Sequence, residues 1–162
     1  IIALGALRAR LEGRAPEDGD AASPPRDEDP IVGEMPTLLT LDAMAAHVRA
    51  LVEDLNRIGG RDEILASMYR HLAHWPAYLA LVHTLIAPFA AEGRLEPLIQ
   101  GVIAEGRHRA ARITAGLATP EQTLETSVQA DMRAALSLFI DGPIGKMITI
   151  VPLIRQAMPR LK

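Results

Sequence analysis

The stretch Ser67-Met-Tyr-Arg-His-Leu-Ala-His-Trp-Pro-Ala-Tyr-Leu-Ala-Leu-Val-His83 contains the only tryptophan of the chain, both tyrosines and three of its five histidines. Apolar residues before Trp75 recur at intervals of three and four, the spacing of one face of an α-helix. Pro76 lacks the N–H that a helix interior needs but fits a first turn, so it ends one helix and opens the next. We therefore predict two helices that meet at Trp75-Pro76 and enclose the indole in the core.

The second of these helices is strongly apolar, since residues 75–91 include no Asp, Glu, Lys or Arg. A membrane-spanning helix needs about 20 predominantly apolar residues. This run is shorter, contains His83 and is broken by two prolines. We interpret it as a buried core helix that is interrupted at Pro88.

The composition is that of one globular domain. Of 162 residues, 49% are hydrophobic and 23% charged, whereas only 3% are aromatic, so the core must be built from aliphatic side chains. The absence of cysteine excludes disulfides, thiolate metal sites and cysteine nucleophiles, and agrees with the cytoplasmic location that we expect. A net charge of −3 argues against a nucleic-acid partner, and we expect no membrane association.

Three segments are expected along the chain. Residues 1–13 are predicted to form a helix that continues from a missing N-terminal part. Residues 14–37 contain five of the twelve prolines and many acids, which predicts a poorly ordered linker. Residues 38–162 are predicted to form an all-helical domain, because apolar residues keep helical spacing and no β-type alternation occurs.

Several boundaries of these helices can be predicted. Thr40 is expected to cap a helix that ends at Gly59-Gly60. Gly60 or Asp62 is expected to cap the next helix, which leads into the stretch 67–83. Thr119-Pro-Glu-Gln122 is a further strong start signal. The prediction is an all-α architecture of about six to eight helices separated by prolines.

Common catalytic motifs are absent from the sequence. There is no Gly-x-Ser-x-Gly, His-Glu-x-x-His or Gly-x-Gly-x-x-Gly pattern. The segment Gly142-Pro-Ile-Gly-Lys146 imitates half of a phosphate loop but lacks the first glycine and the final hydroxyl residue. His71, His74 and His83 have no carboxylate or cysteine in the same segment to complete a metal site, so no metal is expected.

The segment Tyr69-Arg-His-Leu-Ala-His-Trp-Pro-Ala-Tyr-Leu79, with the preceding Asp54-Leu-Asn56, resembles the recurring unit of the DehI-type 2-haloacid dehalogenases. In that unit, a short helix with an Asp is followed by a turn and an aromatic-Arg-x-Leu-Ala-x-x-Pro segment. The resemblance covers residues 41–91 well and the rest by helical pattern only. It implies an all-α fold of two such repeats that form a pseudo-dimer, and this chain looks like the second repeat.

The resemblance also implies hydrolysis of the carbon–halogen bond of a small 2-halo acid, without a metal or organic cofactor. Asp54 takes the place of the acid that activates water for direct displacement of the halide. Ala66-Ser67 stands where the family has an asparagine that positions the water. The candidate substrate-binding residues are Ser67, Tyr69, His74, Trp75 and Tyr78.

A competing hypothesis comes from a different class of function. It is a non-catalytic helical domain whose Trp75 region packs against a partner repeat or a second subunit, as in a homodimer. Asp54 distinguishes the two hypotheses. Catalysis requires a carboxylate sheltered in a pocket, whereas packing leaves Asp54 solvated or paired with a neighbouring arginine, Arg57 or Arg61. The expected partner is thus a small-molecule acid for the enzyme and a helical repeat or subunit otherwise.

Overall fold

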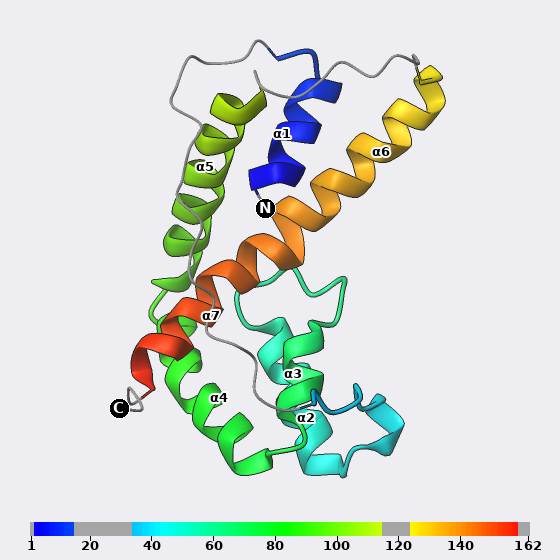
Figure 1. The fold of residues 1–162 in the computed structure, drawn as a ribbon. Coiled ribbons are helices and arrows are strands. Elements are labelled where there is room, and N and C mark those ends of the chain that lie inside the picture. Colours follow the sequence, from blue (N-terminus) through cyan, green and yellow to red (C-terminus); the bar gives the residue numbers. More distant parts are fainter. Residues whose placement is uncertain (1, 15–33, 115–123, 159–162) are drawn as a thin grey trace.

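The computed structural model describes residues 2–14, 34–114 and 124–158, and every regular element in these ranges is helical (Figure 1). The α-helices are α1 (Ile2–Leu11), α2 (Ala46–Arg57), α3 (Ser67–Leu72), α4 (Pro76–Ala91), α5 (Leu95–Thr114), α6 (Thr126–Phe139) and α7 (Gly145–Ala157). Two short helical turns accompany them: η1 (Leu41–Ala43) precedes α2, and η2 (Ile140–Ile144) joins α6 to α7. The all-α prediction is confirmed, and the number of α-helices in the described ranges agrees with it.

The helices form two groups, which α5 and α7 connect (Figure 1). At one end, α2, α3 and α4 pack together, and at the other end α1 packs against α5 and α6. Helix α7 contacts both α4 and α5 where the two groups meet. The helix predicted for residues 1–13 therefore packs against the main helical body.

The core lies between α2, α3 and α4 and the adjoining parts of α5 and α7. As the low aromatic content requires, the fully buried side chains are mostly aliphatic: Val52, Leu55, Tyr69, Leu79, Ile86, Leu95, Ile99 and Ile150. Burying one such aliphatic side chain contributes about 1.5–3 kcal/mol. Tyr69 is thus the fully buried aromatic residue of the stretch 67–83.

The prediction that helices enclose Trp75 is wrong, because 53% of this residue is exposed. Trp75 is the residue that precedes α4, in the turn between α3 and α4, with φ −124° and ψ 75°. A side chain at such a corner belongs to neither apolar helix face. The predicted meeting of two helices at Trp75-Pro76 is confirmed, since Pro76 is the first residue of α4.

The helix before this corner is shorter than predicted. The predicted cap at Gly60 or Asp62 is wrong, because α3 begins only at Ser67, with Ala66 as its N-cap residue. Gly59, Gly60 and Arg61 all have positive φ values, of 77°, 63° and 56°. Such left-handed residues stop a helix, which confirms the predicted end of the preceding helix at Gly59-Gly60.

Two proline and capping predictions need correction. Pro88 lies inside α4, which continues to Ala91. Pro88 is in the last turn of α4, so a bend there disturbs only the few helical residues that follow it. Thr40 makes no side-chain capping bond and leads only into η1, so the long helix begins later, at Ala46. The predicted linker centre and the start signal at 119–122 lie outside the described residues.

Helix α1 is buried through small residues. Its buried positions are Gly5, Ala6, Arg8 and Ala9, whereas Leu7 is exposed. A Cβ atom added to Gly5 would lie 2.9 Å from the Cβ of Ala110 on α5. The close approach of α1 to α5 therefore selects small side chains at the contact.

Candidate functional site

Asp54, the predicted catalytic acid, lies near the end of α2 and pairs with residues on two sides. Its Oδ2 is 2.5 Å from Nε2 of His83 on α4, and Nη2 of Arg57 donates to Oδ1 at 3.3 Å. The hydrogen bond with His83, more than the neighbouring Arg57, lowers the pKa of Asp54, so the carboxylate is ionised at neutral pH.

The Asp54 side chain is 48% exposed and lines neither of the two grooves described below. The expected shelter from water is therefore not found. Of the two arrangements that the sequence left open, the geometry matches the ion-paired one, with Arg57 and His83 as the partners. The pair also ties α2 to α4.

The predicted substrate-binding residues fall into separate places. Ser67 and Trp75 line one groove, described further below. Trp75 also makes an edge-on contact with His74, with ring centroids 5.9 Å apart. Tyr78 lies in a second, apolar groove between α4 and α7, where its hydroxyl donates to Sδ of Met158 at 3.1 Å.

Tyr69 is fully buried, and its hydroxyl has no hydrogen-bond partner among the described residues. Burial raises the pKa of Tyr69 to about 12, because the phenolate is poorly solvated there. Tyr69 is thus a neutral core residue. The structure therefore brings Ser67, His74 and Trp75 together but leaves Asp54, Tyr69 and Tyr78 apart from them.

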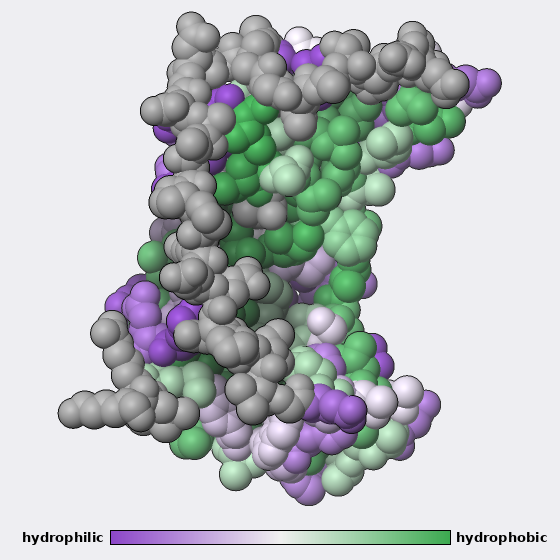
Figure 2. Space-filling view, in the orientation of Figure 1, coloured by the Kyte–Doolittle hydropathy of each residue, from purple (hydrophilic) through white to green (hydrophobic). Residues whose placement is uncertain are grey.

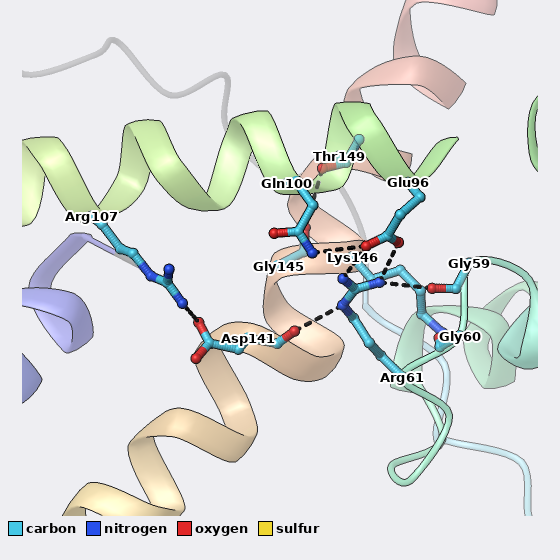
Figure 3. Close-up of polar contacts among 10 residues, drawn as sticks. All are labelled: Gly59, Gly60, Arg61, Glu96, Gln100, Arg107, Asp141, Gly145, Lys146 and Thr149. Carbon is cyan, nitrogen blue, oxygen red and sulfur yellow. Dashed lines mark hydrogen bonds and ion pairs between the residues drawn. The ribbon is translucent and has the colours of Figure 1, made fainter. Parts of the chain in front are cut away.

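A polar cluster that the sequence did not predict lies where the two helix groups meet (Figure 3). Its centre is Lys146, whose side chain is fully buried and donates to the backbone oxygens of Asn56 at 2.6 Å and Gly60 at 2.8 Å. These carbonyls lie at and just beyond the end of α2, where helix carbonyls lack partners. Burial is the main cause that lowers the pKa of Lys146 to about 8.

Asn56 completes the arrangement around the end of α2. Its Nδ2 donates to the oxygen of Asp62 at 3.2 Å, and its Oδ1 accepts from the backbone N–H of Ala66 at 3.1 Å. The loop from α2 to α3 is thereby fixed from inside. Lys146 and Asn56 together cap the end of one helix and lead the chain into the next.

Around this centre, three arginines converge on Asp141 at the junction of α6 and α7. Arg8 of α1 and Arg107 of α5 each donate to its carboxylate at 2.8 Å, and Nε of Arg61 donates to its backbone oxygen at 2.9 Å. Arg61 also binds Glu96 through two 2.7 Å hydrogen bonds (Figure 3). These bonds lower the pKa of Glu96 to about 2.

The segment 142–146, which imitates half of a phosphate loop, has a structural role here. Gly142 has non-helical angles, φ −91° and ψ −121°, and produces a kink within a π-type turn between α6 and α7. A side chain on Gly145 would meet Ile103 at 2.6 Å and the oxygen of Ile140 at 2.8 Å. The glycines thus allow the kink and the contact with α5. The sequence feature that could have indicated the buried Lys146 is its position beside apolar residues of a predicted helix.

Among the described residues, no group of three or more His, Asp or Glu side chains is placed to hold a metal ion. In the same ranges, one helical run, Thr126–Ala157, is long and apolar enough to cross a membrane by length and composition. Of the most apolar 18-residue stretch in this run, 39% is buried within the protein. A core helix of a globular protein passes the same test, so this is weak support for a membrane span.

Comparisons with protein-family models, with curated protein sequences and with solved structures find no match for this chain. No relative's activity therefore bears on the residues described above.

Proposed function

We propose that this chain is a helical interaction domain that pairs with a second copy of itself through α6. The observation that carries the proposal is that none of the 14 residues of α6 is buried. Large apolar side chains on and beside it are between 40% and 47% exposed: Leu124, Val128, Leu138 and Phe139. Figure 2 shows hydrophobic surface gathered over the half of the molecule that contains α1, α5 and α6. Exposed apolar patches of this kind mark interaction sites.

The exposed residues of α6 form a stripe that is complementary to itself. Val128, Ala135 and Phe139 are separated by intervals of seven and four, which keeps them within about 40° of one helix face, and Leu124 lies just before the helix. In an antiparallel pair of α6 helices related by a two-fold axis, Val128 faces Ala135, and Phe139 lies beside the residues that precede α6 of the second copy. The larger Val128 side chain of each copy then lies opposite the smaller Ala135 of the other. The resemblance to DehI-type dehalogenases, which pair two helical repeats, supports a partner of the same kind.

Sedimentation measurements test this pairing. We expect a dimer whose dissociation constant lies in the range of about 1–100 µM. Val128→Asp places a charge in the stripe and should weaken dimerisation at least about tenfold, which corresponds to about 1.4 kcal/mol. The matched control is Leu81→Asp on α4, a residue that is 67% exposed and distant in the sequence from α6. A wild-type chain that stays monomeric at about 100 µM, or equal effects of both variants, contradicts the proposal.

A second candidate function is hydrolysis of a small 2-halo acid at Asp54. The observation that favours it is an ionised carboxylate, held by His83 at 2.5 Å and still accessible to water. In such a reaction, Asp54 takes a proton from water, the water oxygen bonds to C2, and the halide leaves with the electrons of its bond. The lowered pKa of Asp54 makes it a weak base, which is why this function ranks second.

Halide release measures this activity directly. If Asp54 acts as the base, the chain releases chloride from 2-chloropropionate, and Asp54→Asn lowers the rate by about 100-fold or more with the fold intact. Asp42→Asn is the matched control, because the Asp42 side chain is 97% exposed. Absence of halide release from 2-chloro- and 2-bromopropionate ends this candidate.

A further inference from the structure

A groove of about 500 Å³ lies between α3 and the extended segment that precedes η1. Two hydrogen bonds attach this segment to α3 and to the turn that follows it. Nε of Arg70 donates to the oxygen of Leu39 at 2.7 Å, and the ring Nε2 of His74 binds the oxygen of Thr37 at 2.8 Å. The groove therefore has two fixed walls, and its volume is within the range of about 300–1,000 Å³ typical of small-molecule sites.

Apolar groups on both walls are open to solvent. Trp75 is 53% exposed at one side, and Met35 of the extended segment is 65% exposed at the other. An indole face and a thioether are both favourable contacts for an aromatic ring, worth about 0.5–1.5 kcal/mol beyond burial alone. Their exposure in one groove indicates a place where a flat apolar group binds.

The same groove contains two polar side chains one helical turn apart on α3. Ser67 is exposed, and its hydroxyl forms no hydrogen bond within the described ranges. Nδ1 of His71 is shut off from solvent and likewise lacks a partner there. Residues separated by four positions lie on the same helix face, so both side chains line the groove together. The Ser67 hydroxyl is thus the donor that the groove offers to a ligand.

We propose that this groove binds a small planar aromatic molecule that carries an oxygen acceptor. The ring packs between Trp75 and Met35, the oxygen accepts a hydrogen bond from the Ser67 hydroxyl, and the His71 ring forms part of the wall beside it. The site is separate from Asp54 and from the exposed face of α6. It therefore does not depend on the proposed dimer.

Benzamide is a suitable probe, and Trp75 provides the readout because it is the only tryptophan of the chain. Its indole N–H gives a single side-chain resonance in a ¹H–¹⁵N spectrum. We expect a saturable shift of this resonance with a dissociation constant of about 0.1–10 mM, as is usual for so small a ligand. Cyclohexanecarboxamide, which has the same acceptor without the aromatic ring, should bind at least about fivefold more weakly.

Variants separate this site from nonspecific binding. Ser67→Ala should weaken benzamide binding about three- to tenfold. Thr84→Ala, on the exposed surface of α4, is the matched control and should leave it unchanged. Val128→Asp should also have no effect, so that failure of the dimer and failure of this site are distinguishable. Absence of a saturable shift up to about 50 mM, equal binding of both amides, or an unaffected Ser67→Ala protein overturns the proposal.

Discussion

Lys146 shows at the scale of one residue how burial makes stability depend on pH. Its pKa is about 8 in the folded protein, compared with 10.5 for an ordinary lysine. Below pH 8 both states carry the proton, and the cost of burying the charge is fully present. As pH rises from about 8 towards 10.5, the folded protein loses the proton first, so this lysine's contribution to the unfolding free energy increases.

The prediction is therefore that stability due to Lys146 rises with pH between about 8 and 10, as measured by urea unfolding. Above pH 10, Tyr69 acts in the opposite direction, because its raised pKa of about 12 keeps a proton that the unfolded chain loses. Lys146→Met should remove the rise between pH 8 and 10. It should also cost about 1–3 kcal/mol at pH 7, since the carbonyls of Asn56 and Gly60 lose their donor. An unchanged pH profile in this variant contradicts the assignment.

Tyr69 provides a second test at this scale, because its buried hydroxyl has no partner in the described structure. Tyr69→Phe removes an unsatisfied polar group and keeps the ring. We expect an unfolding free energy that is unchanged or up to about 1 kcal/mol higher. Tyr69→Ala should instead cost about 3–5 kcal/mol through lost packing. A loss above about 1 kcal/mol in Tyr69→Phe would show that the hydroxyl is bonded.

At the scale of helices, glycine positions report how closely two elements approach. Gly145 of α7 leaves no room for a side chain beside Ile103 of α5, whereas Gly101 of α5 has nothing within 4 Å. Gly145→Ala should therefore lower the unfolding free energy by about 1–3 kcal/mol. Gly101→Ala should raise it by about 0.5–1 kcal/mol, because alanine favours a helix. Thermal unfolding of the matched pair checks both, and equal shifts would mean that α5 and α7 are not in close contact.

Helices were also the scale at which the sequence was most informative. Apolar spacing and proline chemistry predicted the corner at Trp75-Pro76 and the stop at Gly59-Gly60, because both signals are local. The buried face of α1 was not predictable, since it depends on how near α5 lies. Nor was the placement of the six candidate residues, because a resemblance of short segments does not say how the helices around Trp75, Asp54 and Tyr69 pack. Their exposure depends on which neighbour covers each face.

At the scale of the whole molecule, Asp141 links elements that are far apart in sequence. It joins α1 through Arg8, α5 through Arg107, and the loop after α2 through Arg61. The Arg8 side chain is only 5% exposed, whereas that of Arg107 is 47% exposed. Removing the carboxylate therefore leaves one buried guanidinium without a counter-charge, which is far more costly than losing an exposed pair.

Asp141→Asn should accordingly lower the unfolding free energy by about 2–4 kcal/mol, somewhat less than for a fully buried pair, because Asp141 keeps some contact with solvent. Arg107→Met, which removes only the exposed partner, should cost about 1 kcal/mol or less. Amide hydrogen exchange should locate the damage, with faster exchange in α1 and α6 than in α2 and α4, since only the former group is fastened through Arg8 at the kink. Uniformly faster exchange, or equal losses in the two variants, would mean that the Asp141 carboxylate does not hold α1 at the kink between α6 and α7.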